Sequence, residues 1–238
     1  MSYTQLNAIA YLIVILYMIF VMRKKTSLKI TIVSILTIVV SITIFARIFW
    51  VINTIEYFID GTFGIEELFW MQLGEFKIIG VLIGAIVAIA LLCKIFKKDA
   101  KLILNSGVEA MFLGAGYTKV VCTIVGCCRG KATTLPWAIS YPAYEDYNLH
   151  PTALYEVITW WLCFALLHIL KKKINNDATR ISIVVMIYVL IRMFLLEGLY
   201  AGTEFMGSIT ARITYFTIIA ICIIIIIFNQ RKNKSFKK

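Results

Sequence analysis

Charged residues are scarce in this sequence and proline is almost absent. Only 16% of the 238 residues are charged, whereas 61% are hydrophobic. In an average soluble domain about 25% of the residues are charged and about 45–50% are apolar. A core of this size cannot bury that excess of apolar side chains, which excludes an ordinary soluble domain. All three prolines lie within residues 126–153. This is the longest break between apolar runs, and long breaks of this kind are usually functional or disordered.

Apolar runs near the roughly 20 residues of a membrane helix recur along the chain. They cover 6–22, 28–51, 76–96, 107–125, 154–170, 181–199 and 208–229. The fourth run is the weakest, because glycines and Lys119 interrupt it. The sequence predicts an all-α, polytopic membrane protein with about seven transmembrane helices in one membrane-embedded domain, residues 1–238. The first run lacks a basic n-region and a small-residue cleavage site, so we expect a retained helix rather than a signal peptide.

Most of the 24 lysines and arginines follow the first, third, fifth and seventh runs. By the positive-inside rule these loops are cytoplasmic, which places the N-terminus outside and the C-terminus in the cytoplasm. Such clusters also attract anionic lipid headgroups. The net charge of +11 therefore predicts no nucleic-acid partner, which would require a folded basic face with aromatic platforms.

Between the second and third runs the sequence is acidic and aromatic. Five acidic residues there have three aromatic residues among them: Glu56, Asp60, Glu66, Glu67 and Glu75, with Phe63, Phe69 and Trp70. The pattern is typical of an amphipathic segment anchored at the membrane interface. An ordinary solvated acidic loop is the alternative.

Seven cations lie outside the cytoplasmic clusters. They are Arg47, Lys77, Lys119, Arg129, Lys131, Arg192 and Arg212. An ionisable residue within a span costs about 2.5–3.5 kcal/mol on insertion scales, so Lys119 and Arg192 call for a function or a partner. Glu109, Glu156 and Glu197 are candidate counter-ions. Two interpretations stay open: internal ion pairs that fix helix packing, or an outward-facing anion site in which arginine grips phosphate with two donors.

The stretch GCCRGK, residues 126–131, suggests several kinds of site. It fails as a Walker loop, because only three residues separate its glycines and alanine follows its lysine. A zinc site formed by Cys127, Cys128 and His150 is disfavoured by the adjacent cysteines. A disulfide from Cys122 to either neighbour remains open for a loop outside the cell. A nucleophilic thiol would need a nearby base, which the sequence does not identify.

The favoured interpretation of GCCRGK is a turn after the fourth helix. Gly126 and Gly130 would allow the chain to reverse. Arg129 and Lys131 would then reach a lipid phosphate.

His150-Pro-Thr-Ala-Leu-Tyr-Glu156 resembles the HPSQLYE-type motif of bacterial prolipoprotein diacylglyceryl transferases. The segment KVVCTIVGCCRGK aligns without gaps to the central motif of that family. A P-W-A…Y-P segment, an E-G-L and an I-G-V-L-I-G stretch, likened to the family's H-G-G-L-I-G turn, add to the resemblance. These segments are 119–131, 136–142, 197–199 and 79–84. The resemblance covers roughly residues 74–215, the expected catalytic region.

The resemblance implies transfer of the diacylglyceryl group of phosphatidylglycerol to the cysteine thiol of a prolipoprotein lipobox, with glycerol phosphate leaving. It implies phosphatidylglycerol or another anionic phospholipid and a lipobox peptide as partners, no cofactor or metal, and a multi-pass location in the bacterial plasma membrane. The implied phosphate-binding residues are Lys119, Arg192, Arg129 and Lys131. The implied catalytic residues are His150, Tyr155 and Glu156, with Glu197 and Arg212 in secondary positions.

The sequence departs from the family pattern at working positions. Lys119 and Tyr200 stand where the family has arginine, and Ile79 replaces its histidine. Arg192 precedes Glu197 by five residues where the family spacing is four; five residues turn an α-helix by about 500°, so we expect the pair on different faces. Two alternatives follow: a divergent paralogue that binds phospholipid but uses another acceptor or none, and a non-enzymatic membrane transport or assembly protein.

Overall fold

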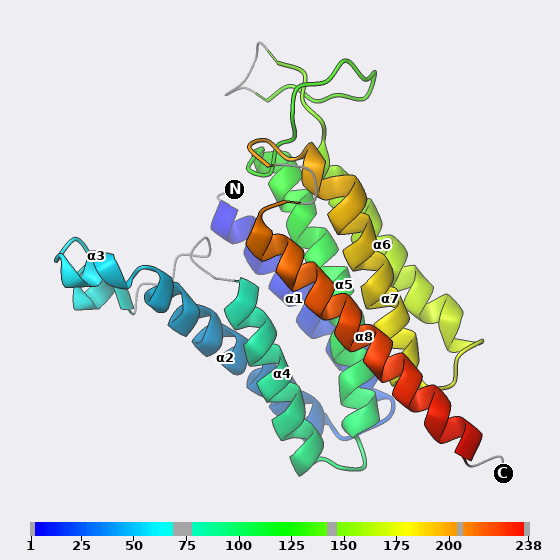
Figure 1. Cartoon of the computed structure of the whole chain (residues 1–238). Helices are drawn as coiled ribbons and strands as arrows, with labels where there is room; N and C mark the ends of the chain where they lie inside the picture. Colours follow the sequence, from blue (N-terminus) through cyan, green and yellow to red (C-terminus); the bar gives the residue numbers. More distant parts are fainter. Residues whose placement is uncertain (1–2, 69–77, 142–146, 204–206, 236–238) are drawn as a thin grey trace. The chain divides into compact units, whose positions relative to one another are not determined.

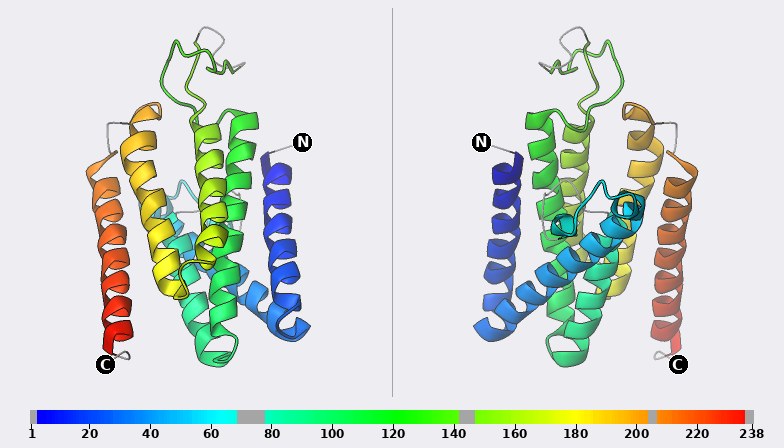
Figure 2. Two further views of the ribbon diagram at one scale, coloured as in Figure 1. Left: turned by 90° about the vertical axis from the view of Figure 1, so that its right-hand side faces the viewer. Right: turned by 90° about the vertical axis from the view of Figure 1, so that its left-hand side faces the viewer.

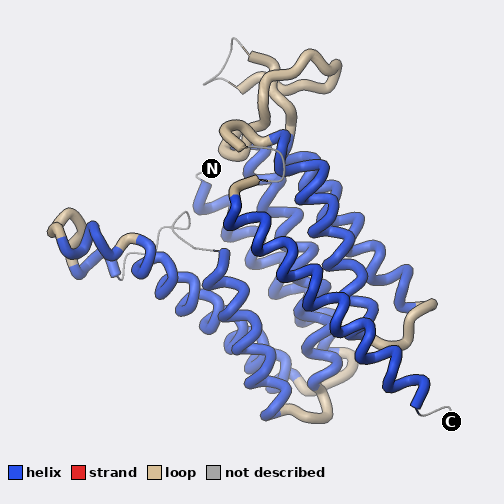
Figure 3. The backbone as a smooth tube through the Cα atoms, viewed as in Figure 1, coloured by secondary structure: helices blue, strands red, loops and turns tan. Residues whose placement is uncertain are grey.

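The computed structural model describes residues 3–68, 78–141, 147–203 and 207–235. All regular elements in these ranges are helical, joined by loops (Figure 3). The chain forms two compact units, 1–110 and 111–238. Whether the whole chain acts as one domain stays a prediction.

The first unit is built on helix pairs. Its elements are α1 (Tyr3–Arg23), α2 (Leu28–Asn53), α3 (Ile55–Ile59), the 3-10 helix η1 (Ile65–Leu68), α4 (Ile78–Ile95) and the first part of α5 (Ala100–Val125) (Figure 1). Ser27 caps α2, since its hydroxyl accepts from the amide of Ile30 at 3.3 Å. The core gathers buried Met22, Leu92 and Ile103, which come from α1, α4 and α5.

Helix α4 packs closely against α2 through two glycines. A Cβ on Gly80 would lie 2.3 Å from the Phe45 carbonyl oxygen, and one on Gly84 would lie 2.6 Å from that of Ser41. The Ser41 hydroxyl donates to the Gly84 carbonyl at 2.8 Å. Small residues four apart allow this approach. The segment 79–84, likened above to a family turn, is helical from Ile78, as the apolar run 76–96 predicted, and its glycines serve helix packing.

The acidic, aromatic segment forms a ring cluster. Trp50 stacks on Phe63 with centroids 5.8 Å apart, and Phe58 meets both rings edge-on. Its interfacial position stays a prediction, and the expected anchors Phe69 and Trp70 lie outside the described residues.

The second unit carries the rest of α5, then α6 (Thr152–Lys171) and α7 (Asp177–Ile191). The π-helix η3 (Arg192–Leu196) and the 3-10 helix η4 (Glu197–Leu199) continue α7, and α8 (Ile209–Ser235) ends the unit. Helix α7 packs against both α6 and α8 (Figure 2). Asn176 caps α7 by accepting from the amide of Thr179 at 3.0 Å.

In their described parts all seven apolar runs are helical but for single terminal residues, and the weak fourth run is included, because α5 is continuous over its 26 residues. Among the described residues, five helices are long and apolar enough to cross a membrane, and the apolar stretches Tyr11–Arg23 and Ile83–Ile95 are shorter. Helix α8 exposes large apolar side chains such as Phe216, Ile224 and Phe228, as a lipid-facing helix does. The chain is a polytopic helical membrane protein; seven spans and an outside N-terminus stay predictions.

Candidate functional site

The GCCRGK stretch begins as a turn that ends α5, as predicted. Gly126 adopts φ +74°, and its amide donates to the Cys122 carbonyl at 2.9 Å. A left-handed glycine is a common helix C-cap because it has no Cβ to clash. The turn leads the chain back over the end of α5.

Gly130 then passes between two other motif segments. Its amide donates to the His150 carbonyl at 3.1 Å, while the His150 amide donates to the Lys131 carbonyl at 2.9 Å. On the other side the Lys131 amide donates to Leu199 at 2.8 Å, and the Ala201 amide donates to Arg129 at 3.2 Å. The GCCRGK, HPTALYE and EGL segments, far apart in sequence, are thus tied together by backbone hydrogen bonds.

Glu156 lies at the centre of an ion-pair network within the second unit. Its carboxylate is 2.5 Å from Lys119 Nζ and 3.1 Å from Arg192 Nε. Its side chain is only 2% exposed, whereas those of Lys119 and Arg192 are 24% and 19% exposed. Helices α5, α6 and the end of α7 therefore bring their three intramembrane charges to one point.

Arg192 also pairs with Glu197, which corrects the expectation that the two lie on different faces. Arg192 Nη2 is 2.9 Å from Glu197 Oε2. The chain is π-helical from Arg192 to Leu196, and the Glu197 amide donates to the Arg192 carbonyl. A π turn closes hydrogen bonds five residues apart rather than four. The extra residue is absorbed, and the pair shares a face.

Tyr200 and Tyr215 complete the network, and neither was expected there. The Tyr215 hydroxyl donates to Glu197 Oε2 at 2.7 Å. The Tyr200 ring lies under two cations, with its centroid 4.5 Å from the Arg192 guanidinium carbon and 5.8 Å from Lys119 Nζ. Tyr200 carried a signal, since it follows the EGL segment where the resemblance implies arginine. Tyr215 lies 18 residues beyond Glu197, and no sequence pattern marks it.

The expected counter-ions divide between two places. Glu156 and Glu197 pair with Lys119 and Arg192 as predicted. Glu109 lies in the first unit instead, where it accepts a hydrogen bond from Tyr17 at 2.9 Å.

His150 and Tyr155 form a cluster apart from the ion pairs. The Tyr155 hydroxyl accepts from Trp137 Nε1 at 2.7 Å and lies 3.5 Å from His150 Nδ1. Tyr155 precedes Glu156 on α6 but points elsewhere, because successive helical residues are about 100° apart. The three residues expected to be catalytic therefore occupy two neighbouring places.

The remaining expected cations stand outside the ion-pair network. Arg129 is half-buried and has partners of its own, while Lys131 is exposed. Arg212 lies in the first turns of α8, where its amide donates to Ser208 at 3.0 Å. Their expected contacts with lipid phosphate stay predictions.

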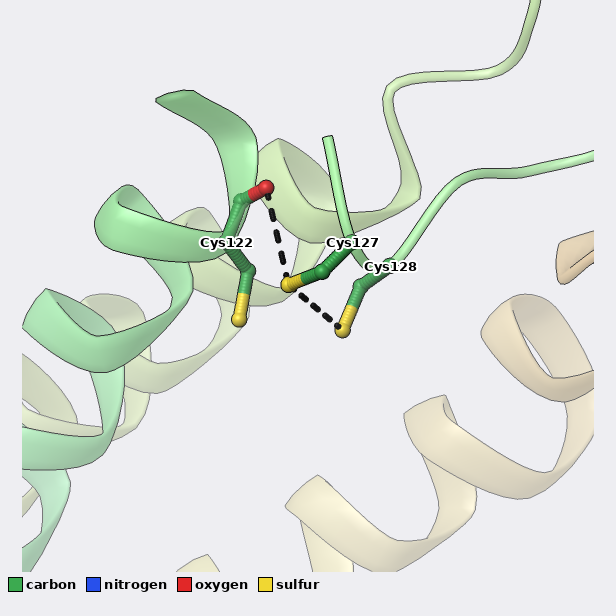
Figure 4. A group of neighbouring side chains, drawn as sticks. All are labelled: Cys122, Cys127 and Cys128. Atoms are coloured by element: carbon green, nitrogen blue, oxygen red, sulfur yellow. Dashed lines mark hydrogen bonds between the residues drawn. The ribbon is translucent and has the colours of Figure 1, made fainter. Parts of the chain in front are cut away.

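Three thiols gather at the end of α5 (Figure 4). The sulfur atoms of Cys122, Cys127 and Cys128 all lie within 4.8 Å of one another, and none is in a disulfide. Cys128 Sγ is 4.0 Å from Lys119 Nζ. Hydrogen bonds from the Cys122 and Cys127 thiols, together with the charges of Lys119 and Arg192, hold the pKa of the Cys128 thiol below its usual value.

The network can still receive an anion. Its two cations face two carboxylates, so its formal charges cancel. No described residue hydrogen-bonds to Arg192 Nη1 or to the Tyr200 hydroxyl. Buried donors without partners cost about 1–3 kcal/mol each, so both atoms are candidate donors to an anion.

The fold and site define a multi-pass helical membrane protein with a buried ion-pair network tied to a cysteine-rich loop. The family model described as "Prolipoprotein diacylglyceryl transferase" matches residues 1–229. The chain belongs to the prolipoprotein diacylglyceryl transferase family.

Curated relatives agree with this membership. A protein of Clostridium tetani is 31% identical over 150 residues, which cover 60% of this chain and 60% of the relative. One of Finegoldia magna is 30% identical over 198 residues, which cover 81% of this chain and 75% of the relative. One of Clostridioides difficile is 27% identical over 191 residues, which cover 80% of this chain and 74% of the relative. All three are named phosphatidylglycerol–prolipoprotein diacylglyceryl transferase.

Proposed function

We propose that this protein transfers the diacylglyceryl group of phosphatidylglycerol to the cysteine thiol of a prolipoprotein lipobox, in the bacterial plasma membrane. The observation that carries the proposal is a pair of donors with no partner among the described residues, Arg192 Nη1 and the hydroxyl of Tyr200, whose ring lies beside Lys119. Family membership and the names of the relatives support the reaction.

The reaction requires the protein to bind a phosphate group and to stabilise the negative charge that develops on it as it leaves. The acceptor sulfur forms a bond to the glyceryl carbon, and the bond from that carbon to the phosphate oxygen breaks. The bonding electrons leave with glycerol phosphate, and the thiol proton passes to a base or to the leaving phosphate. Donors already placed around the leaving oxygens stabilise this step without reorganising.

Arg192 is the residue best placed for this role. Its Nε and Nη2 are held by Glu156 and Glu197, which fixes the plane of the guanidinium and leaves Nη1 for the ligand. A held guanidinium loses little conformational entropy on binding. In this proposal Glu156 and Glu197 position Arg192, and Lys119 supplies a second positive charge.

The His150 cluster is proposed to serve the acceptor side. His150 is half-buried and touches Tyr155, and its backbone is hydrogen-bonded to the GCCRGK segment. An imidazole is a suitable acceptor for a thiol proton at neutral pH. Arg129 and Lys131, on the same loop, are proposed to guide the anionic lipid.

One assay separates the readings. Purified protein in phosphatidylglycerol vesicles with a labelled headgroup is mixed with a cysteine lipobox peptide or its serine counterpart. We expect labelled glycerol phosphate to be released with the cysteine peptide only. Release with both peptides would indicate hydrolysis and contradict the proposal.

Phospholipid binding without transfer is the second candidate. It is favoured by Ile79, which leaves no histidine at the position where the resemblance expects one. Retention of labelled lipid by the purified protein, with no headgroup release under any condition, would establish this candidate over the transferase.

A further inference from the structure

The three clustered thiols do not enter the proposed lipid chemistry. Cys122 is buried in the last turn of α5, Cys128 is half-buried and Cys127 is exposed. The turn at Gly126 brings Cys127 back towards α5, so that its sulfur lies 3.9 Å from the Cys122 carbonyl oxygen. The sequence motif alone paired Cys127 and Cys128 with His150; the structure supplies Cys122 as the third sulfur.

We propose that Cys122, Cys127 and Cys128 bind one thiophilic d10 cation such as Zn²⁺, with a fourth coordination position left for a ligand from outside the chain. Zn–S bonds are about 2.3 Å, so sulfurs of a tetrahedral site are about 3.8 Å apart. The Cys127 and Cys128 sulfurs are 3.8 Å apart, and all three lie within 4.8 Å. Small rotations of the side chains close the site.

The charge around the cluster suits such an ion. Three thiolates and a divalent cation carry one net negative charge, and Lys119 Nζ lies 4.0 Å from the Cys128 sulfur. Thiolate ligands select soft ions such as Zn²⁺ and Cu⁺ over Mg²⁺ or Ca²⁺. The exposed Cys127 gives an ion access from solvent.

Three protein ligands and one open position are the arrangement of catalytic rather than structural zinc sites. A thiol that takes the open position is deprotonated by the metal. The thiol would pass its proton to His150, the acceptor in the proposed function, and its sulfur would keep the electron pair. This step rests on the proposed function, in which the acceptor is a thiol: the open position is then the place where the lipobox cysteine becomes a thiolate.

Metal binding is tested on the full chain in detergent, reduced and freed of metal, without lipid or peptide. Co²⁺ serves as the probe, because thiolate-to-cobalt absorption reports its ligands. We expect one Co²⁺ per chain, displaced by Zn²⁺, with protons released on binding. Cys122→Ser, Cys127→Ser and Cys128→Ser should each weaken binding by tenfold or more, about 1.4 kcal/mol. Cys163→Ser and Cys222→Ser, buried elsewhere, are the matched controls and should bind as the wild type does.

Equal binding by the wild type and the triple serine variant, both with full helical circular dichroism, would overturn the site. The site would also be overturned if the protein isolated without reductant contained a disulfide at Cys122 that persisted when metal was added. The open position is tested by adding the lipobox peptide to the Co²⁺-loaded protein. The cysteine peptide should shift the visible absorption and the serine peptide should not; equal spectra would overturn the open position. Neither result depends on headgroup release, so failure of the transferase proposal is seen separately.

Discussion

Arg192 and Glu197 form a 2.9 Å ion pair across a π-helical turn. The same guanidinium reaches Glu156 on α6 through Nε at 3.1 Å. Two carboxylates from different elements therefore hold one arginine in a single orientation. The arrangement gives the second unit a fixed cation at the end of α7, next to the loop that carries GCCRGK.

Replacing Arg192 with lysine keeps the charge but removes the fork. An ammonium cannot pair with Glu156 and Glu197 while also presenting a third donor in the same plane. One charge-assisted hydrogen bond is worth about 1.5–3 kcal/mol. We expect Arg192→Lys to lower kcat/KM for phosphatidylglycerol by about tenfold or more. Arg231→Lys, at the exposed end of α8, is the control; an equal loss in both variants would show that the fork is irrelevant.

Tyr200→Phe separates the ring of Tyr200 from its hydroxyl. The ring contact with Arg192 persists, and the hydroxyl has no described partner to lose, so thermal stability should not fall. Phospholipid binding should weaken by about 2- to 13-fold, the worth of one neutral hydrogen bond of about 0.5–1.5 kcal/mol. Tyr200→Leu should lower both stability and binding. Unchanged lipid affinity in the phenylalanine variant would remove Tyr200 from the phosphate site.

Glu156→Gln leaves Lys119 and Arg192 facing a neutral amide in a buried place. Removing one partner of a buried ion pair costs about 3–5 kcal/mol. We expect a clear fall in the thermal unfolding temperature measured in detergent. Adding Lys119→Met should recover part of the loss, because the unpaired cation is then gone. Losses that simply add in the double variant would show that the two residues do not interact.

Gly130→Ala probes the backbone hydrogen bonds that tie the GCCRGK, HPTALYE and EGL segments together. The new Cβ would lie 2.5 Å from His150 Cβ and 2.6 Å from the His150 carbonyl oxygen, so the segments must separate. Overpacking of this kind costs about 1–3 kcal/mol, and we expect activity to fall with stability. Gly107→Ala is the control, since its Cβ meets only Ile38 Cδ1 at 3.9 Å. Wild-type activity in Gly130→Ala would mean that the close contact between the three motif segments does not support the site.

Much of this arrangement follows from residue type alone. The length of the apolar runs predicted the helices. The cost of a charge within a span made Glu109, Glu156 and Glu197 candidate counter-ions of Lys119 and Arg192, and the structure pairs the last two with them. The helix period failed where the backbone left the α form: no local signal marks the π turn that brings Arg192 and Glu197 together. Such turns depend on tertiary contacts.

Long-range contacts were the other limit. In the sequence, Cys122 is only five and six residues from Cys127 and Cys128. The turn at Gly126 brings their sulfur atoms together in space. The contact of Tyr215 with Glu197 joins α8 to the end of α7, and helix periodicity says nothing about which partner a face meets. The apolar run 76–96 predicted a helix over 79–84, but it did not show that the glycines there allow close packing against α2.

The most direct test of the central claim counts both products in one sample. Purified protein, phosphatidylglycerol and the cysteine lipobox peptide are incubated together, and mass spectrometry measures the diacylglyceryl thioether and the glycerol phosphate. We expect equal amounts of the two products from the wild type and a parallel fall of both in Arg192→Lys. Bound phosphatidylglycerol with no thioether, or thioether formation unaffected by Arg192→Lys, would contradict it.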